Sequence, residues 1–302
     1  MIERIVASPR VAQALAEGTP VVALETSVLA QGLPHPVNVE AGRAMAGAVR
    51  AAGAEPASVW VDGGTIRVGF DNDAQMEWLA TVGTAAKVAR RDLPVALAGG
   101  GTGATTVSAT LWAAHRAGIE VMATGGIGGV HPGTGDVSAD LLELARTPGT
   151  VVCSGPKSIV DPDATLERLE ELGVVVVGFG TDRLPFFLTR SSGLPLEHRA
   201  EDAAAVAAMA VARRDLGVDS ALLVCNPIPS GAAMDAVEVS RAVEGSIAEA
   251  EARGVKGKAV TPFLLSCLAQ RTEGRSVRAN VALLEANAGL AGAIAEEMAE
   301  GR

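Results

Sequence analysis

Short runs of aliphatic and β-branched residues alternate along the chain with longer, Ala-rich segments that carry scattered charges. Six of the short runs are continuously apolar, as strands buried on both faces of a sheet are: "PVVALET" (20–26), "ASVWVDGG" (57–64), "IEVMATGG" (119–126), "TVVCSG" (150–155), "VVVVGF" (174–179) and "ALLVCNP" (221–227). Four of the longer segments have helical spacing and end at a Gly: "NVEAGRAMAGAVRAAG", "GATTVSATLWAAHRAG", "DATLERLEELG" and "EDAAAVAAMAVARRDLG". A repeated order of strand and helix predicts right-handed crossovers and a mainly parallel sheet.

The pattern therefore predicts an α/β fold of three layers, α/β/α, with a mainly parallel central sheet. The last third of the chain is expected to be mostly helical, with long helices near 236–253 and 277–299. No Pro/Ser-rich linker, internal repeat or low-complexity tract divides the chain, so a single domain over residues 1–302 is expected. Hydrophobic residues make up 48% of the chain, aromatic residues 3%, and Tyr is absent, so the core must consist of Ala, Val, Leu and Ile.

Charge and cysteine content exclude several classes of function. The net charge is -10 and no long basic run occurs, which argues against binding to a nucleic acid polymer. Cys153, Cys225 and Cys267 are widely spaced and form no CxxC pair, so we expect small buried side chains and neither disulfides nor a zinc site. The N-terminus lacks the apolar core of a signal peptide, and no segment has 18 unbroken apolar residues. These features predict a soluble, cytoplasmic protein without a membrane segment.

Polar residues follow several of the predicted strands. Glu25 follows "VVAL", Asp62 follows "SVWV", Thr124 precedes a Gly-Gly pair after "EVMA", and Lys157 lies just beyond "VVCSGP". In open α/β sheets, ligands bind at the carboxyl ends of the strands. Each residue alone has a simpler explanation, such as a cap or a solvated loop, but together they predict a site that includes Thr124 among its substrate-binding residues.

Two Gly-rich segments are candidate ligand loops. The first, "AGGGTGATTVSAT" (98–110), is expected to run from a strand into a helix, where backbone N–H groups can hold a phosphate. It matches neither the dinucleotide fingerprint nor the Walker pattern, which disfavours NAD and ATP and leaves a sugar phosphate or a purely structural turn.

The second segment, "ATGGIGGVHPGTGDVSADL" (123–141), carries His131, Asp136, Ser138 and Asp140. Asp136 and Asp140 are four residues apart, so they could share a cation through oxygen ligands, but such a pattern before a helix is more often a cap. A site of oxygen ligands with one His would favour Mg²⁺ or Mn²⁺ over Zn²⁺.

Lysine is rare in this chain, which holds 25 Lys and Arg residues of which four are Lys. A Lys amine can attack a carbonyl and form a Schiff base, whereas a guanidinium cannot. Lys157, after a buried strand and a Gly-Pro, is therefore a candidate nucleophile; the alternative is a surface Lys that caps a helix or pairs with Asp161 or Asp163. Lys87, next to Arg90 and Arg91, is a candidate phosphate ligand or part of a solvated basic patch. Together they indicate a lysine-dependent sugar-phosphate enzyme.

Several of these segments together resemble the pseudouridine-5'-phosphate glycosidase family. The matching motifs occur in the family's order and span nearly the whole chain: "ALETSVLAQGLPHPVN", "KVARRDLP", "GATTVSAT", "ATGGIGGVH", "DVSADL", "PKSIVD" and "NPIP". The resemblance implies a homotrimeric α/β/α enzyme that uses a divalent metal, manganese or magnesium. It implies reversible cleavage of pseudouridine 5'-phosphate into uracil and ribose 5-phosphate through a lysine imine.

The resemblance also implies roles for individual residues. It assigns Glu25 as the proton donor, Lys157 as the covalent nucleophile and Asp136 as the metal ligand. The substrate-binding positions that it implies are Lys87, the Val107 backbone, Ser138, Ala139, Asp140 and, near the base, His131 and Asn280.

One segment departs from the family. Between the loop His and the metal-binding Asp, members usually have a longer stretch that begins His-Arg-Gly-Ala-Glu, whereas this chain has "HPGTGD" (131–136). The sugar-phosphate half of the site is thus expected to be intact, whereas the identity of the base or acceptor that is joined to the sugar is left undetermined. Two alternatives follow: a C-nucleoside synthase that couples ribose 5-phosphate to a different acceptor, and a non-catalytic sugar-phosphate-binding protein.

Overall fold

The computed structural model describes residues 4–133, 135–255, 257 and 260–301. Within them, eleven strands form one sheet: β1 (Ile5–Ala7), β2 (Val21–Leu24), β3 (Glu55–Asp62), β4 (Thr65–Val68), β5 (Ala86–Val88), β6 (Gly103–Thr105), β7 (Val121–Ala123), β8 (Thr150–Cys153), β9 (Val175–Phe179), β10 (His198–Ala200) and β11 (Leu222–Cys225). The strands follow the order β1-β4-β3-β2-β7-β8-β11-β9-β10, and β6 joins β5 to β3 off this path. All pairings are parallel except β3 with β4 and β3 with β6.

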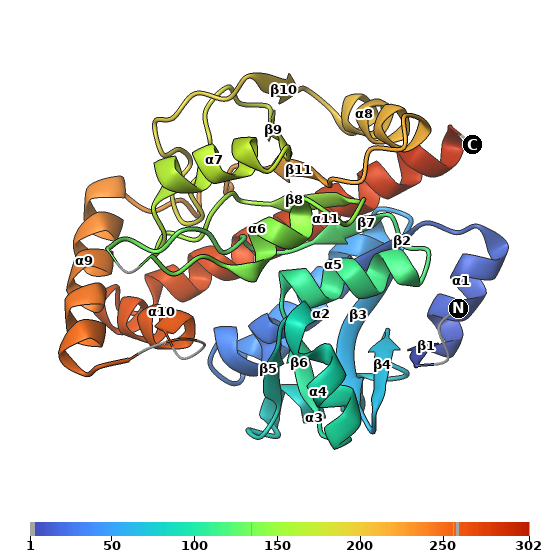
Figure 1. The fold of residues 1–302 in the computed structure, drawn as a ribbon, viewed down its shortest axis with the longest axis horizontal. Helices are drawn as coiled ribbons and strands as arrows, with labels where there is room; N and C mark the ends of the chain where they lie inside the picture. The colour runs from blue at the N-terminus through green and yellow to red at the C-terminus, as the bar shows by residue number, and fades with distance from the viewer. Residues whose placement is uncertain (1–3, 134, 256, 258–259, 302) are drawn as a thin grey trace.

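Helices cover both faces of this sheet (Figure 1). The helices of the described residues are α1 (Pro9–Glu17), α2 (Val37–Ala51), α3 (Asp73–Thr81), α4 (Leu93–Gly99), α5 (Val107–Arg116), α6 (Ala139–Leu144), α7 (Pro162–Glu171), α8 (Ala203–Asp215), α9 (Ala236–Ala252), α10 (Val260–Arg271) and α11 (Arg275–Glu300), with the short π-helix η1 (Val28–Gly32) and the 3-10 helix η2 (Arg90–Asp92). The predicted three-layer α/β fold with a mainly parallel sheet is confirmed.

Alternate residues of the central strands belong to two separate cores. In β2, Val22 and Leu24 pack with α2, α8 and α11, whereas Val21 and Ala23 pack with α1, α5 and α6. β11 divides in the same way, with Leu222 and Val224 in the first core and Leu223 and Cys225 in the second. Because successive side chains of a strand point to opposite faces, a strand between two helical layers must be apolar throughout. This explains the continuous runs in the sequence.

The longest helix, α11, lies along one face of the sheet and contacts β2, β7 and β8 (Figure 1). Its apolar side is nearly continuous, from Ala279 to Met298, and packs into the first core. Its residues therefore reach the ends of several strands at once. No helix of the described residues is long and apolar enough to cross a membrane.

The structure corrects three expectations. Residues 98–110 do not simply run from a strand into a helix, because α4 ends at Gly99 and the three-residue strand β6 intervenes before α5. The helix expected from Gly103 consequently begins at Val107. Asp62 ends β3, which extends beyond β2 into the β3–β4 turn, and its Oδ1 accepts a hydrogen bond from Thr102 Oγ1 at 3.0 Å, so it is not part of the site. Cys153, Cys225 and Cys267 are free and buried, as predicted.

Candidate active site

A cavity lies beyond the carboxyl ends of β2, β7 and β8, which are neighbours in the sheet. Ten of the eleven candidate residues line it: Glu25, Lys87, Val107, His131, Asp136, Ser138, Ala139, Asp140, Lys157 and Asn280. They come from segments far apart in the sequence and from both faces of the sheet. The eleventh, Thr124, lies directly behind Glu25.

Glu25 is held in a fixed orientation at the cavity floor. Its side chain follows β2 and is 4% exposed. One carboxylate oxygen accepts a hydrogen bond from Thr124 Oγ1, and the other accepts one from Ser27 Oγ at 2.5 Å. Glu25 thus neither caps a helix nor solvates a loop, and Thr124 positions it through a hydroxyl group that is completely buried.

Lys157 lies on a segment that extends the β7–β8 pairing beyond the ends of the strands. The Ser154 N–H donates to the Gly125 carbonyl at 2.9 Å, Ile127 N–H to Gly155 O at 3.1 Å, and Lys157 N–H to Ile127 O at 3.0 Å. This ladder fixes the backbone from which the Lys157 side chain enters the cavity. Asp161, a candidate partner of Lys157, instead caps α7 by accepting hydrogen bonds from two backbone N–H groups.

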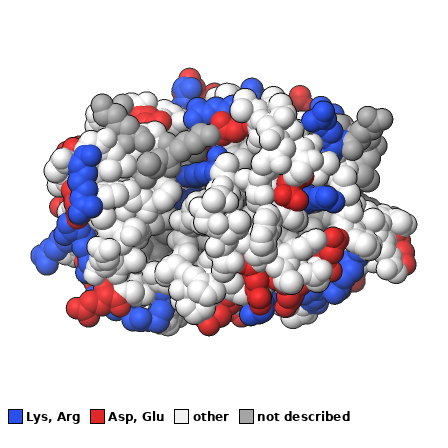
Figure 2. All heavy atoms as spheres, turned by 90° about the horizontal axis from the view of Figure 1, so that it is seen from below, with Lys and Arg blue, Asp and Glu red and all other residues white. Residues whose placement is uncertain are grey.

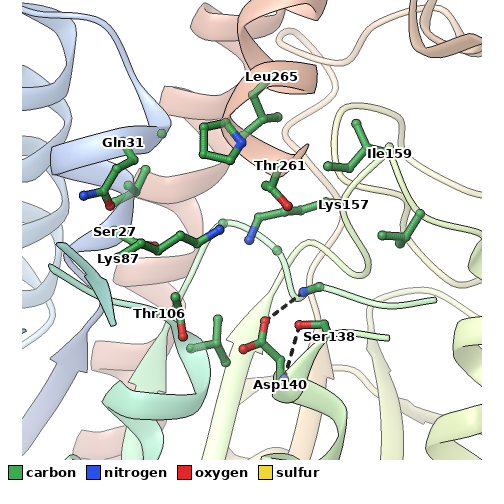
Figure 3. A pocket seen from close by; sticks show the side chains of 18 of the residues that line it. Ser27, Gln31, Lys87, Thr106, Ser138, Asp140, Lys157, Ile159, Thr261 and Leu265 are labelled. Atoms are coloured by element: carbon green, nitrogen blue, oxygen red, sulfur yellow. Dashed lines mark hydrogen bonds between the residues drawn. The ribbon is translucent and has the colours of Figure 1, made fainter. Parts of the chain in front are cut away.

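Lys87 enters the cavity from the opposite wall, on β5 (Figure 3). β5 is short and is held by parallel pairing with β6, where Lys87 is in register with Ala104. The ammonium groups of Lys87 and Lys157 both point into the same space, with Thr261 of α10 above them (Figure 3). Two cationic groups in one cavity form an attractive environment for an anionic ligand.

The lower wall contains the start of α5 and the start of α6. The buried Asp140 carboxylate accepts hydrogen bonds from the backbone N–H of Ser108 (3.1 Å) and of Gly128 (3.0 Å), and Ser138 Oγ caps α6 by accepting from Asp140 N–H at 3.2 Å (Figure 3). Gly128 has no room for a side chain, because a Cβ there would lie 2.3 Å from Ser138 Oγ. Asp140 therefore braces α5 against the Gly-rich loop and holds Val107 at the cavity.

His131 and Asp136 lie next to each other through a backbone hydrogen bond. Val130 and Val137 are bridged in antiparallel fashion, and His131 N–H donates to the Asp136 carbonyl at 2.8 Å. Burial lowers the pKa of His131 below its usual value; the Asp136 carboxylate opposes this shift, and the ammonium groups of Lys87 and Lys157 add to it. The imidazole thus faces both lysines and the carboxylate.

The donor atoms fit an open site for a hard cation. The exposed Asp136 offers one carboxylate at the edge of the cavity, and the described residues contain no group of three or more His, Cys, Asp and Glu side chains that could enclose a metal ion. The Asp140 carboxylate is already engaged by two backbone N–H groups. Asp136 is the carboxylate that could hold a cation such as Mn²⁺ or Mg²⁺ here, with water or substrate oxygens as the further ligands.

The upper part of the cavity was not anticipated from the sequence. Its walls are formed by η1 and by α10, with Val28, Gln31, Pro262 and Leu265 among the lining residues (Figure 3). Gln31 Nε2 donates to the Ala85 carbonyl at 2.9 Å, and its Oε1 has no hydrogen-bond partner among the described residues. Asn280 Oδ1 is also buried and also has no hydrogen-bond partner among the described residues. The upper part is thus mainly apolar and contains Gln31 Oε1, whereas Asn280 Oδ1 lies next to Gly125 at the end of β7 and the two lysines enter from the side walls.

Comparison with known proteins identifies the family to which the chain belongs. The family model described as indigoidine synthase A like protein matches residues 10–297. The chain belongs to this family. A curated member from Paracoccus denitrificans, named pseudouridine-5'-phosphate glycosidase, is 51% identical over 300 residues, which cover 98% of each chain. Another of the same name, from Methylobacterium nodulans, is 50% identical over 291 residues, which cover 95% of this chain and 86% of the relative.

Two solved structures share the whole fold. The prealnumycin C-glycosynthase AlnA, in complex with ribulose 5-phosphate, has a TM-score of 0.90 and 38% identity, covering 100% of this chain and 99% of AlnA. An indigoidine synthase A-like protein from Thermotoga maritima has a TM-score of 0.91 and 38% identity, covering 99% and 98% of the two chains. Relatives within this one fold thus carry names for both a C-glycosidase and a C-glycosynthase.

Proposed function

We propose that this member of the indigoidine synthase A like family is a pseudouridine-5'-phosphate glycosidase. It cleaves the carbon–carbon glycosidic bond of pseudouridine 5'-phosphate with water, reversibly, and gives uracil and ribose 5-phosphate. The observation that carries the proposal is that Glu25, Lys87 and Lys157 meet in one cavity of a chain about half identical to relatives of that name. The cavity also has a cationic part for a phosphate and an apolar part for a base.

A carbon–carbon glycosidic bond needs an electron sink, because carbon is a poor leaving atom and two carboxylates alone do not suffice. In the proposed first step, Glu25 protonates the ring oxygen as the C1'–O4' bond breaks. The Lys157 ammonium group passes a proton to the Glu25 carboxylate left by this step, and the neutral amine then bonds to C1' and loses a second proton to water. Lys157 thereby becomes the group that can accept the positive charge when the base leaves.

In the second step, C5 of the base receives a proton, and the C1'–C5 bond breaks with its electron pair on the base. C1' becomes doubly bonded to the Lys157 nitrogen as an iminium, and uracil departs. Water then adds to C1', the C–N bond breaks, and ribose 5-phosphate and free Lys157 are released. Glu25 is the residue placed to move these protons, since its carboxylate lies at the cavity floor between Thr124 and Ser27.

Binding of the sugar phosphate is assigned to Lys87 and the lower wall. Lys87 supplies charge, and Val107, Ser138 and Ala139 supply polar backbone groups and a hydroxyl beside it. Mn²⁺, or Mg²⁺ in its place, would be held by Asp136 and would orient and polarise oxygen atoms there.

We extend the proposal to a homotrimer, as the resemblance implies. Sedimentation should then give a mass about three times the chain mass of 30.5 kDa.

One observation favours a second candidate, a C-nucleoside synthase. The segment at 131–136 is short and lies at the cavity, and AlnA, named as a C-glycosynthase, shares the full fold. The same Lys157 chemistry run backward would join ribose 5-phosphate to an acceptor other than uracil. The base pocket, not the sugar chemistry, separates the two candidates.

Two measurements test the proposal. Purified protein is incubated with ribose 5-phosphate and borohydride, and the reduced adduct is located by peptide mass mapping; release of uracil from pseudouridine 5'-phosphate is followed separately. We expect the adduct on Lys157, no adduct in Lys157→Arg, and uracil release by the wild type. An adduct absent from Lys157 contradicts the mechanism for both candidates. An adduct on Lys157 without uracil release, together with coupling of another heterocycle, selects the synthase.

A further inference from the structure

Asn287 lies on α11 behind the cavity and connects the ends of three strands. Its side chain is completely buried, and it is not among the residues that line the cavity. The Nδ2 group donates to the Thr124 carbonyl at 2.9 Å and to Ser154 Oγ at 3.1 Å, and Oδ1 accepts from Asn226 Nδ2 at 3.0 Å. These partners follow β7, β8 and β11, three adjacent strands of the sheet.

One set of hydrogen bonds, which we call the Thr124 arm, connects Asn287 to Glu25, the proposed proton donor. Thr124, whose carbonyl Asn287 holds, donates its hydroxyl hydrogen to Glu25. A residue held at its carbonyl has less freedom to move its side chain, so Asn287 helps to fix the Thr124 hydroxyl in the direction of Glu25. Loss of the Asn287 donor would leave a buried carbonyl without this partner, and the backbone would shift to find another.

A second set of hydrogen bonds, which we call the Ser154 arm, connects Asn287 to the segment that carries Lys157, the proposed nucleophile. Ser154, which shares hydrogen bonds with Asn287, begins the segment that reaches Lys157 three residues later. That segment is paired to the Thr124–Ile127 segment through Ser154 N–H to Gly125 O and Lys157 N–H to Ile127 O. Asn287 therefore clamps the two paired segments at the point where both leave the sheet.

We propose that Asn287 is a positioning residue that sets Glu25 and Lys157 relative to each other, through Thr124 on one side and Ser154 on the other. The inference rests on the catalytic roles proposed above for Glu25 and Lys157. An amide is suited to this position because it donates to a carbonyl and a hydroxyl while accepting from Asn226, which no aliphatic or carboxylate side chain of the same size can do.

The first test replaces the amide by a group of the same shape. In Asn287→Asp, two donors become an acceptor that faces the Thr124 carbonyl. We expect kcat for uracil release to fall by about 100-fold, as a misplacement of about 1 Å near the reacting groups does. The KM for pseudouridine 5'-phosphate should change by less than about threefold, because the phosphate contacts at Lys87 and the lower wall are not altered. Ile66→Ala, in the distant strand β4 between β1 and β3, serves as a matched control that lowers stability without removing a hydrogen bond of Asn287, Thr124 or Ser154.

The second test separates the two arms. Thr124→Val removes the hydroxyl that contacts Glu25, and Ser154→Ala removes the hydroxyl that contacts Asn287. Thr124→Val should slow uracil release more than it slows formation of the borohydride-trapped adduct, and Thr124→Ser should restore most of the loss. Ser154→Ala should slow adduct formation by about tenfold or more. The effects of Thr124→Val and Asn287→Asp on uracil release should not multiply in the double variant, because both act through one contact.

The outcomes distinguish the two proposals. If the wild type forms no adduct on Lys157 and releases no uracil, the proposed function fails first. If the wild type is active but Asn287→Asp keeps kcat within threefold, or loses no more than Ile66→Ala, the positioning role is wrong. If Asn287→Asp does not fold, Thr124→Val and Ser154→Ala decide the question. The inference is contradicted if each of these two variants slows uracil release and adduct formation to the same extent.

Discussion

The amide oxygens, carboxylates and lysines of the cavity differ in how tightly they are held. Glu25 has both oxygens bound by hydroxyl groups, whereas Lys87 and Lys157 extend into the open space. An acid held by two hydroxyl groups, with the Lys157 side chain entering the same cavity, suits a reaction in which one group transfers protons while the other bonds to the sugar carbon. The rigidity of Glu25 can be examined separately from its acidity.

Glu25→Gln keeps the volume of the side chain but removes the exchangeable carboxyl proton. We expect uracil release to fall by about 100-fold to 10,000-fold, the usual range for loss of a general acid. Circular dichroism and binding of ribose 5-phosphate should be nearly unchanged, because Thr124 and Ser27 can still donate to the amide oxygen or reorient. Single-turnover release of uracil measures the effect, and activity within threefold of the wild type would assign the proton transfer to another group.

His131 should make stability depend on pH. Its pKa is lowered in the folded protein, so the unfolded chain binds the proton more tightly and begins to do so near the ordinary value of 6.5. The stabilising contribution is present above pH 6.5 and is lost as the pH falls toward the lower folded pKa. Urea unfolding at pH 7.5, 6.5 and 5.5 should show this decline, and His131→Gln should reduce it, leaving the part contributed by His115, whose pKa burial also lowers. A decline of equal size in His131→Gln would assign the dependence to other groups.

At the scale of elements, the turn before Lys157 depends on one glycine. Gly155 has φ of +79°, and a Cβ there would lie 2.0 Å from the carbonyl oxygen of Pro185, which is backbone and cannot rotate away. Gly173, at the end of α7, has φ of +70° but no atom within 4 Å of such a Cβ. The two positions therefore share the backbone penalty and differ in the clash.

Gly173→Ala should lower the free energy of unfolding by about 1–2 kcal/mol and leave the rate of adduct formation nearly unchanged. Gly155→Ala should lower it by about 3 kcal/mol or more, since the clash adds to the backbone term, and should slow adduct formation on Lys157. Urea denaturation and borohydride trapping measure both. Equal losses in the two variants would mean that the Pro185 contact relaxes without displacing the segment.

The elements that could be predicted are those whose signal is local. The six central strands were recognisable because both of their faces are buried, and their carboxyl ends led directly to Glu25 and Lys157. Strands β4, β5 and β6 have three or four residues each and are held by pairing with other strands. They are too short to show a hydrophobic periodicity from which they could be predicted. Lys87 was a candidate phosphate ligand from its sequence surroundings as well as from the resemblance, but its placement on β5 was not predicted. Asn287 has no local signature at all, since its role arises where α11 crosses the ends of three strands.

At the scale of the whole molecule, an acidic protein contains a cavity with inward-pointing lysines. The net charge is -10, and on the face that Figure 2 shows, basic and acidic side chains are interspersed. The charge of Lys87 and Lys157 is thus directed into the cavity from two opposite walls and not spread over a surface. A small anion with a shape that fits the cavity should bind there, and its binding should stabilise the fold.

Ribose 5-phosphate at about 100 times its Kd should raise the free energy of unfolding by about 2.7 kcal/mol, because it binds the folded chain alone. For a chain of this length the corresponding rise in Tm is about 5 °C. Lys87→Gln should reduce the rise strongly, and ribose without phosphate should give little of it. Arg168→Gln, on the exposed side of α7, removes one positive charge as well and should keep the full rise. Differential scanning calorimetry of each variant without ligand, with ribose 5-phosphate and with ribose measures these changes in Tm. A rise lost equally in Arg168→Gln and Lys87→Gln would mean that net charge, and not the lysine in the cavity, binds the phosphate.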